Sequence, residues 1–359
     1  MIQLYCDDRI GGRLRYFLSR TPPSLMFVPD EVRKCVVYAG ARRLNGEEVF
    51  AGTAFFVGRS IPNTNRVFYY LITAHHNIQK IENHPDKYEK KVLLRMNLKD
   101  GSVSTIESNP DDWIRHPVDP RIDVAVLPNV SQLELIADIS VLPLEMFANQ
   151  EIIEREEIAI GDELFLTGLF TDRMGKSRNI PIVRVGNIAA MPDPNEKITT
   201  GMGPNEGYLV ESRSIGGLSG APVFVTVEHR ISKGNLPVGT GEREKKKFYL
   251  LGLMHGHYDT KIVEEPKPLM DIRTEAEEVV NMGIAVVIPA DKIFETIDQP
   301  MIRNPEIQHE EALQKEKAPT MDNALDSPDA FSQDDFQEAL RKASQKLSQP
   351  VLEKKETSE

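Results

Sequence analysis

Residues 216–222 read Gly216-Gly-Leu-Ser-Gly-Ala-Pro222 and lead directly into the apolar run Val223-Phe-Val225. A serine in a glycine-rich turn before a strand suits a nucleophile, because glycine lets backbone amides converge on one point without a Cβ in the way. A serine hydroxyl remains a poor nucleophile until a neighbouring imidazole takes its proton. If Ser219 is a nucleophile, the chain should also contain a histidine that acts as its base and a carboxylate that orients this histidine.

Two segments earlier in the chain supply these groups. Leu71-Ile-Thr-Ala-His-His-Asn-Ile78 is an apolar strand that ends in small residues and then in histidine. Asp123-Val-Ala-Val-Leu-Pro128 places an acid at the start of another apolar strand. The chain thus offers histidine, aspartate and serine in that order, with His75 and His76 both open as the base.

Taken together, the three segments resemble the chymotrypsin/trypsin superfamily of serine peptidases. The similarity is nearest to its disulfide-poor bacterial Deg-type and glutamyl-endopeptidase branches, and it covers about residues 30–298. The resemblance implies a catalytic triad of His76, Asp123 and Ser219, with His75 in a position that the family fills with a small residue. It also implies an oxyanion hole made by the backbone amides of Gly217 and Ser219.

One departure from the family pattern bears on activation. Leu218 replaces the acid that precedes the nucleophile in trypsin-like zymogens, where it pairs with the new amino terminus. Leucine cannot form that ion pair. The expected enzyme therefore does not need N-terminal cleavage to form its oxyanion hole.

Most of the chain reads as short strands rich in β-branched and aromatic residues, separated by turn residues. Strands without intervening helices predict an all-β fold. The resemblance implies two six-stranded antiparallel barrels, at about residues 30–140 and 150–290, within a peptidase domain at 30–298. A short helix is expected at Pro289–Ile297, and residues 1–29 form an N-terminal extension.

Substrate-binding residues follow from the same resemblance. Arg213, six residues before the nucleophile, is expected at the floor of the primary specificity pocket, followed by Ser214. The strand Leu250–His257 is expected to pair with an extended peptide, which makes Met254, His255, Gly256 and His257 pocket-wall residues. A guanidinium at the floor favours acidic substrate side chains. Alternatively, Arg213 turns away, leaving a preference for small or apolar residues.

Composition limits the partners. Asp plus Glu is 55 against 43 for Lys plus Arg, a net charge of −12, which predicts binding of neither nucleic acid nor a membrane surface. With two cysteines, no secretory signal and no apolar run long enough to span a bilayer, we expect a cytoplasmic protein. The chain contains no Walker loop, dinucleotide fingerprint or zinc-ligand spacing, so neither a cofactor nor a metal is expected.

The composition changes near residue 299. Residues 301–359 contain 13 acidic and 8 basic residues but no Trp or Tyr, which predicts an acidic, mostly disordered tail at 299–359. Within it, Phe336, Leu340, Ala343 and Leu347 form an apolar stripe on a possible helix at 332–348. That helix is either weakly formed in solvent or folds against a protein partner or against the body of the molecule.

The sequence therefore predicts a serine endopeptidase that hydrolyses protein or peptide substrates through an acyl-enzyme. A catalytically silent peptide-binding module on the same fold, and an esterase for small acyl groups, remain the alternatives.

Overall fold

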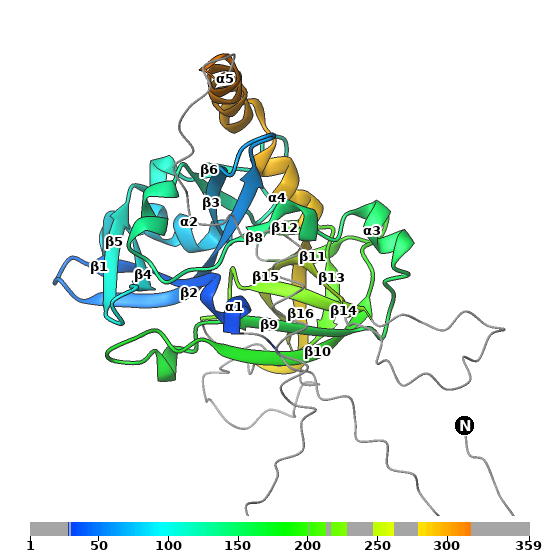
Figure 1. The fold of residues 1–359 in the computed structure, drawn as a ribbon. Coiled ribbons are helices and arrows are strands. Elements are labelled where there is room, and N and C mark those ends of the chain that lie inside the picture. The colour runs from blue at the N-terminus through cyan, green and yellow to red at the C-terminus, as the bar shows by residue number, and fades with distance from the viewer. Residues whose placement is uncertain are drawn as a thin grey trace, which may run out of the picture.

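The computed structural model describes residues 28, 30–200, 202–212, 217–227, 247–261 and 279–316. In these ranges the chain forms two β units that lie side by side, one from each half of the sequence (Figure 1). The predicted all-β class is confirmed, and one of the two units is a closed barrel of six strands.

The N-terminal unit is an eight-stranded sheet in the order β5-β4-β1-β2-β3-β7-β6, with β8 added in parallel beside β2. It does not close into a second six-stranded barrel, because in the described residues no pairing joins β5 to β6, the strands at the two ends of this order. The strands are β1 (Val36–Arg43), β2 (Glu48–Ser60), β3 (Val67–Thr73), β4 (Tyr88–Asn97), β5 (Val103–Ser108), β6 (Ile114–Arg115), β7 (Ala125–Pro128) and β8 (Leu142–Pro143).

The C-terminal unit closes into a barrel in the order β10-β13-β16-β15-β14-β9. Its strands are β9 (Glu163–Gly168), β10 (Ile182–Ala190), β13 (Tyr208–Glu211), β14 (Pro222–Val227), β15 (Lys247–Lys261) and β16 (Val279–Pro289). A separate hairpin of β11 (Ile198–Thr200) and β12 (Gly203–Asn205) lies between β10 and β13 in the sequence.

The long strand β2 shows how the two units share a core. Successive side chains of a strand point to opposite faces. Phe55 therefore packs in a cluster that also contains Phe165 and Phe224 of the barrel, whereas Phe56 packs inside the N-terminal unit. The apolar seam between the units is continuous, and it fixes the position of one sheet against the other.

Five α-helices are described, besides short 3-10 turns: α1 (Asp30–Lys34), α2 (His75–Asn83), α3 (Gln150–Arg155), α4 (Ala290–Ile297) and α5 (Pro300–Glu316). The predicted helix after Pro289 is present as α4, and Ile293 and Ile297, one turn apart, are fully buried in the shared core. Within the described ranges no helix is both long and apolar enough to span a membrane.

Helix α5 differs from the disordered tail predicted from residue 299. It projects beyond α4 in Figure 1 but is anchored at its start, where Ile302 is 3% exposed in the shared core. Glu306 is equally buried and accepts a hydrogen bond from the Tyr70 hydroxyl. These tertiary contacts compensate for the weak apolar stripe of the segment. Residues 317–359, with the possible helix at 332–348, lie outside the described residues.

Candidate active site

His76 lies where β3 gives way to helix α2. Strand β3 pairs antiparallel with β7, and the register sets Thr73 opposite Ala125. This pairing brings the residues that follow β3 close to those that precede β7. His76 and Asp123 therefore meet, although 47 positions separate them in the sequence.

Asp123 holds His76 through two contacts. One carboxylate oxygen, Oδ1, accepts the backbone N–H of His76 at 2.8 Å, and Oδ2 lies 2.7 Å from the ring Nδ1. Asp123 is completely buried, whereas the His76 side chain is 17% exposed. The carboxylate thus fixes both the backbone and the ring of the histidine, while the ring keeps access to solvent.

Asp123 is charged despite its burial. Desolvation raises the pKa of this carboxyl group, but the charges and hydrogen bonds of His76 and His255 outweigh it and hold the pKa below its usual value. A buried ionised carboxylate that accepts imidazole N–H groups can stabilise an imidazolium formed during catalysis.

His255 contacts the same carboxylate from the other unit. Its Nδ1 lies 2.5 Å from Asp123 Oδ2, and its ring meets the His76 ring edge-on with centroids 5.5 Å apart. The sequence placed His255 on the wall of the specificity pocket. In the structure its ring faces Asp123, which is 132 positions away in the sequence. No local sequence pattern predicts this contact.

Ser219 lies in the turn that precedes β14, on the same side of the barrel as His255. Gly217 and Gly220 on either side have φ values of +98° and +84°, which L side chains rarely adopt. The Ser219 hydroxyl donates to the backbone oxygen of His255 at 3.1 Å, and in the described part of the chain no hydrogen bond joins it to His76. Catalytic hydrogen bonds are often longer in free enzymes and shorten when substrate binds.

The serine turn is held by the N-terminal unit. The Thr53 backbone N–H donates to Ser219 O at 2.9 Å, and the Thr53 hydroxyl donates to Gly217 O at 2.7 Å. The same hydroxyl accepts from Leu169 N at 2.9 Å, and the Asn77 amide donates to Ser219 O at 3.1 Å. Two carbonyls of the turn are thereby fixed.

The amides of Gly217 and Ser219 remain available for an oxyanion. Neither donates a hydrogen bond to another described residue. Leu218 between them is fully buried in the core of the barrel. Sequence reasoning missed the role of Thr53, whose only signal was its place beside a glycine in an apolar strand.

Of the other predicted substrate-binding residues, only Met254 and Gly256 are fully described. Met254 is buried, and its backbone bonds with Ala221 and Gly220 at 2.8 and 2.7 Å. Gly256 is half-buried, with open space where a Cβ would be. His257 belongs to β15, and its side chain is not described. Arg213 and Ser214 lie outside the described residues.

His75, the alternative histidine, points elsewhere. It is 2% exposed, and neither of its ring nitrogens has a hydrogen-bond partner among the described residues. Burial, followed by the positive charge of Arg115, lowers the pKa of His75. The geometry thus favours His76 as the histidine that works with Asp123.

The three side chains His76, Asp123 and His255 also form a donor set of the kind that binds transition metals, with ligand atoms within 4.8 Å of one another. Ligands at about 2.0–2.1 Å around one tetrahedral ion would stand about 3.3 Å apart. The nitrogen–oxygen distances here are 2.5 and 2.7 Å. Those are the lengths of hydrogen bonds, so protons explain this cluster better than an ion.

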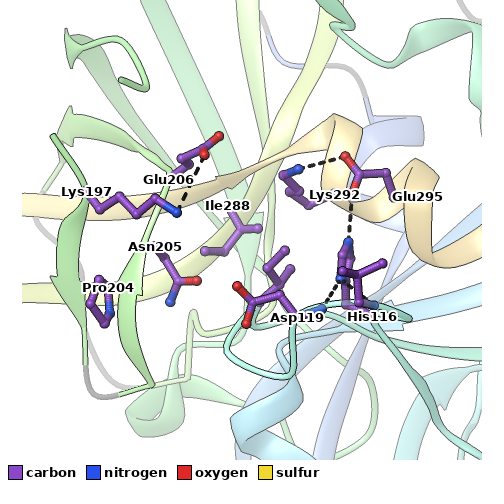
Figure 2. Close-up of a pocket in the computed structure, with 11 residues that line it drawn as sticks. His116, Asp119, Lys197, Pro204, Asn205, Glu206, Ile288, Lys292 and Glu295 are labelled. Carbon is purple, nitrogen blue, oxygen red and sulfur yellow. Dashed lines mark hydrogen bonds and ion pairs between the residues drawn. The ribbon is translucent and has the colours of Figure 1, made fainter. Parts of the chain in front are cut away.

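A cavity of about 230 Å³ opens beside the site, between the hairpin β11–β12, helix α4 and the loop before Asp123 (Figure 2). Its charged groups are paired: Lys197 with Glu206 at 3.9 Å, Glu295 with both Lys292 at 2.7 Å and His116 at 2.8 Å, and Asp119 with Arg121 at 2.7 Å. None of His76, Ser219 and His255 lines it. This balanced cavity is separate from the candidate active site.

No protein-family model and no curated protein sequence matches the chain. Among solved structures, it is similar to human heparin binding protein and to a second chain described as an atomic-resolution structure of HBP. In each case the identity is 11%, the TM-score is 0.37, and the match covers 83% of this chain and 97% of the other. What the site can do therefore rests on its own geometry.

Proposed function

We propose that this chain is a serine endopeptidase with His76 as general base, Asp123 as its orienting acid and Ser219 as nucleophile. The observation that carries the proposal is the double contact of the buried Asp123 with His76, next to a serine turn in which the Gly217 and Ser219 amides donate to no other described residue. That combination supports acyl transfer without a cofactor.

The reaction follows from the positions of the protons. Asp123 keeps the His76 proton on Nδ1, which leaves Nε2 to take the proton from the Ser219 hydroxyl as its oxygen attacks the substrate carbonyl. The oxyanion that forms accepts hydrogen bonds from the amides of Gly217 and Ser219. His76 then gives its proton to the leaving amine, and an acyl-enzyme remains on Ser219. Water, deprotonated by His76, then attacks the acyl group, and His76 returns this proton to the Ser219 oxygen as the bond to the acid breaks.

The described contacts that support the serine turn come from the barrel core and from the N-terminal unit. Leu218 packs in the barrel core, and Thr53 and Asn77 hold the carbonyls of the turn from the other unit. We infer that the enzyme is active without cleavage of its N-terminus. Specificity remains the proposal made from the sequence: a preference for acidic side chains set by Arg213 or, if Arg213 turns away, for small or apolar ones.

One observation favours a second candidate, a silent peptide-binding module: the Ser219 hydroxyl bonds to the backbone of His255 and not to His76. A fluorophosphonate probe separates the two functions. The full chain should label at Ser219, and Ser219→Ala should not label. Cleavage of a proteome-derived peptide library, compared with ester turnover, then distinguishes a peptidase from an esterase. A chain that binds peptides but never labels would contradict the enzymatic proposal.

A further inference from the structure

Asp123 receives an imidazole from each half of the molecule. His76 comes from the junction after β3, in the N-terminal unit, and His255 comes from β15 of the barrel. The two ring nitrogens approach the same oxygen, Oδ2, at 2.7 and 2.5 Å. The His255 side chain is 11% exposed, so little water competes for this contact.

We propose that His255 is a positioning residue of the catalytic site, which fixes Asp123 with a second N–H and so holds His76 ready to act as base. The proposal rests on the proposed peptidase function and adds to it a fourth side chain.

The strand geometry supports a dedicated role. In the pairing of β15 with β16, Met254 lies opposite Val287 and Gly256 lies opposite Val286, so His255 is the extra residue of a β-bulge. A bulge changes the direction in which a side chain points and often occurs beside an active site. Here it turns the His255 ring out of the regular alternation of the strand and toward Asp123.

The hydrogen bonds also determine where the protons sit. Asp123 is ionised and can only accept, so each ring must carry a proton on its Nδ1. The Nε2 atom of a neutral His76 is then the free acceptor that a general base needs. Without His255, Oδ2 would lose one of its two donors in a buried place, and the carboxylate could turn away from His76.

His255 also contacts the nucleophile through its backbone. Its carbonyl oxygen accepts the Ser219 hydroxyl at 3.1 Å. The bulge therefore places one residue against both the acid and the serine. A substitution that keeps the bulge should leave the backbone contact in place and remove only the side-chain contact.

Two variants of the full chain separate these roles. His255→Asn keeps an N–H donor close to the position of Nδ1, whereas His255→Leu fills the space without a donor. We expect His255→Leu to lower kcat about 10- to 100-fold, with KM changed less than threefold, because it removes a hydrogen bond to a charged group. We expect His255→Asn to retain kcat within about fivefold. His116→Leu, which alters a histidine paired with Glu295 away from the site, should match the wild type in kcat.

The contact has a readout that does not need activity. In Ser219→Ala labelled with ¹⁵N-histidine, two strongly deshielded N–H protons should appear, one from each ring on Asp123, and His255→Leu should remove one of them. If both signals persist in His255→Leu, or if the Asn and Leu variants lose kcat equally, the positioning role is wrong. If the wild type shows both signals but neither labels nor cleaves, the peptidase proposal fails while the contact stands.

Discussion

Two buried carboxylates, Asp123 and Glu306, serve different purposes in this molecule. Asp123 is fully buried between two imidazoles, whereas Glu306, 3% exposed, lies among the Tyr70 hydroxyl and the guanidinium groups of Arg59 and Arg303. An imidazole exchanges its proton near neutral pH, but a guanidinium does not. Burial raises the pKa of Tyr70, so the phenol keeps its proton as well. Partners, not burial, decide which carboxylate can orient a group that transfers protons.

Of the substitutions that test this comparison, Asp123→Asn should have the largest effect on activity. We expect kcat to fall on the order of 10⁴-fold, because an amide in place of the carboxylate favours the wrong tautomer of His76. Steady-state hydrolysis of a peptide substrate measures the loss, and thermal denaturation should show that the fold is retained. Near-normal turnover in this variant would remove Asp123 from the proposed mechanism.

Glu306→Leu should lower stability and leave activity unchanged, the reverse of what we expect for Asp123→Asn. It removes the acceptor of the Tyr70 hydroxyl and the buried partner of Arg59, and breaking such a pair costs about 3–5 kcal/mol. We expect the free energy of unfolding in urea to fall by about that amount, while kcat/KM at 25 °C stays within twofold.

Glu311→Leu is the matched control for Glu306→Leu, because residue 311 is an exposed position on the same helix. It should leave stability nearly unchanged. A loss of activity in Glu306→Leu without a loss of stability would mean that α5 acts on the site and does not merely pack against the body.

Thr53, like Asp123, supports the proposed catalytic site, because its hydroxyl and backbone hold the turn that carries Ser219. Thr53→Val keeps the shape but loses the hydroxyl that bridges Gly217 O and Leu169 N. We expect a peptide boronic acid, which mimics the tetrahedral intermediate, to bind about tenfold more weakly, because the oxyanion amides lose their fixed direction. Thr53→Ser should restore tight binding. Equal inhibition constants for the Val and Ser variants would show that the hydroxyl does not position the turn.

Sequence alone could indicate those side chains of the candidate site that stand in recognisable local patterns. His76, Asp123 and Ser219 each stand at the end of an apolar strand or in a glycine-rich turn, and such patterns are short enough to read directly. Helix α4 was equally readable from the spacing of Ile293 and Ile297. The class of fold followed from the many short strands, because alternation and turn residues are also local.

The groups that sequence could not locate depend on contacts between distant parts of the chain. Thr53 and Gly217 are 164 positions apart, and Tyr70 and Glu306 are 236 apart. The bulge that turns His255 toward Asp123 depends on how β15 pairs with β16, and no single strand reveals that register. Helix α5 looked like a solvated tail for the same reason: its composition is polar, and its anchors Ile302 and Glu306 find partners only in the folded molecule.

His75 offers the smallest effect and a third case, a buried titratable group without a partner. Burial lowers its pKa, so the folded chain binds fewer protons at this residue than the unfolded chain, whose histidines titrate near about 6.5. Stability should therefore rise with pH across this range and fall as the pH drops from about 7 to 5.

His75→Leu replaces two unsatisfied nitrogens with apolar atoms, which is neutral or stabilising by about 1 kcal/mol at pH 8. Urea unfolding at pH 8, 6.5 and 5 should show the advantage of His75→Leu growing as the pH falls. An advantage that stays constant with pH would mean that His75 does not titrate differently in the folded chain, and a loss of stability at every pH would mean that its ring is satisfied in solution.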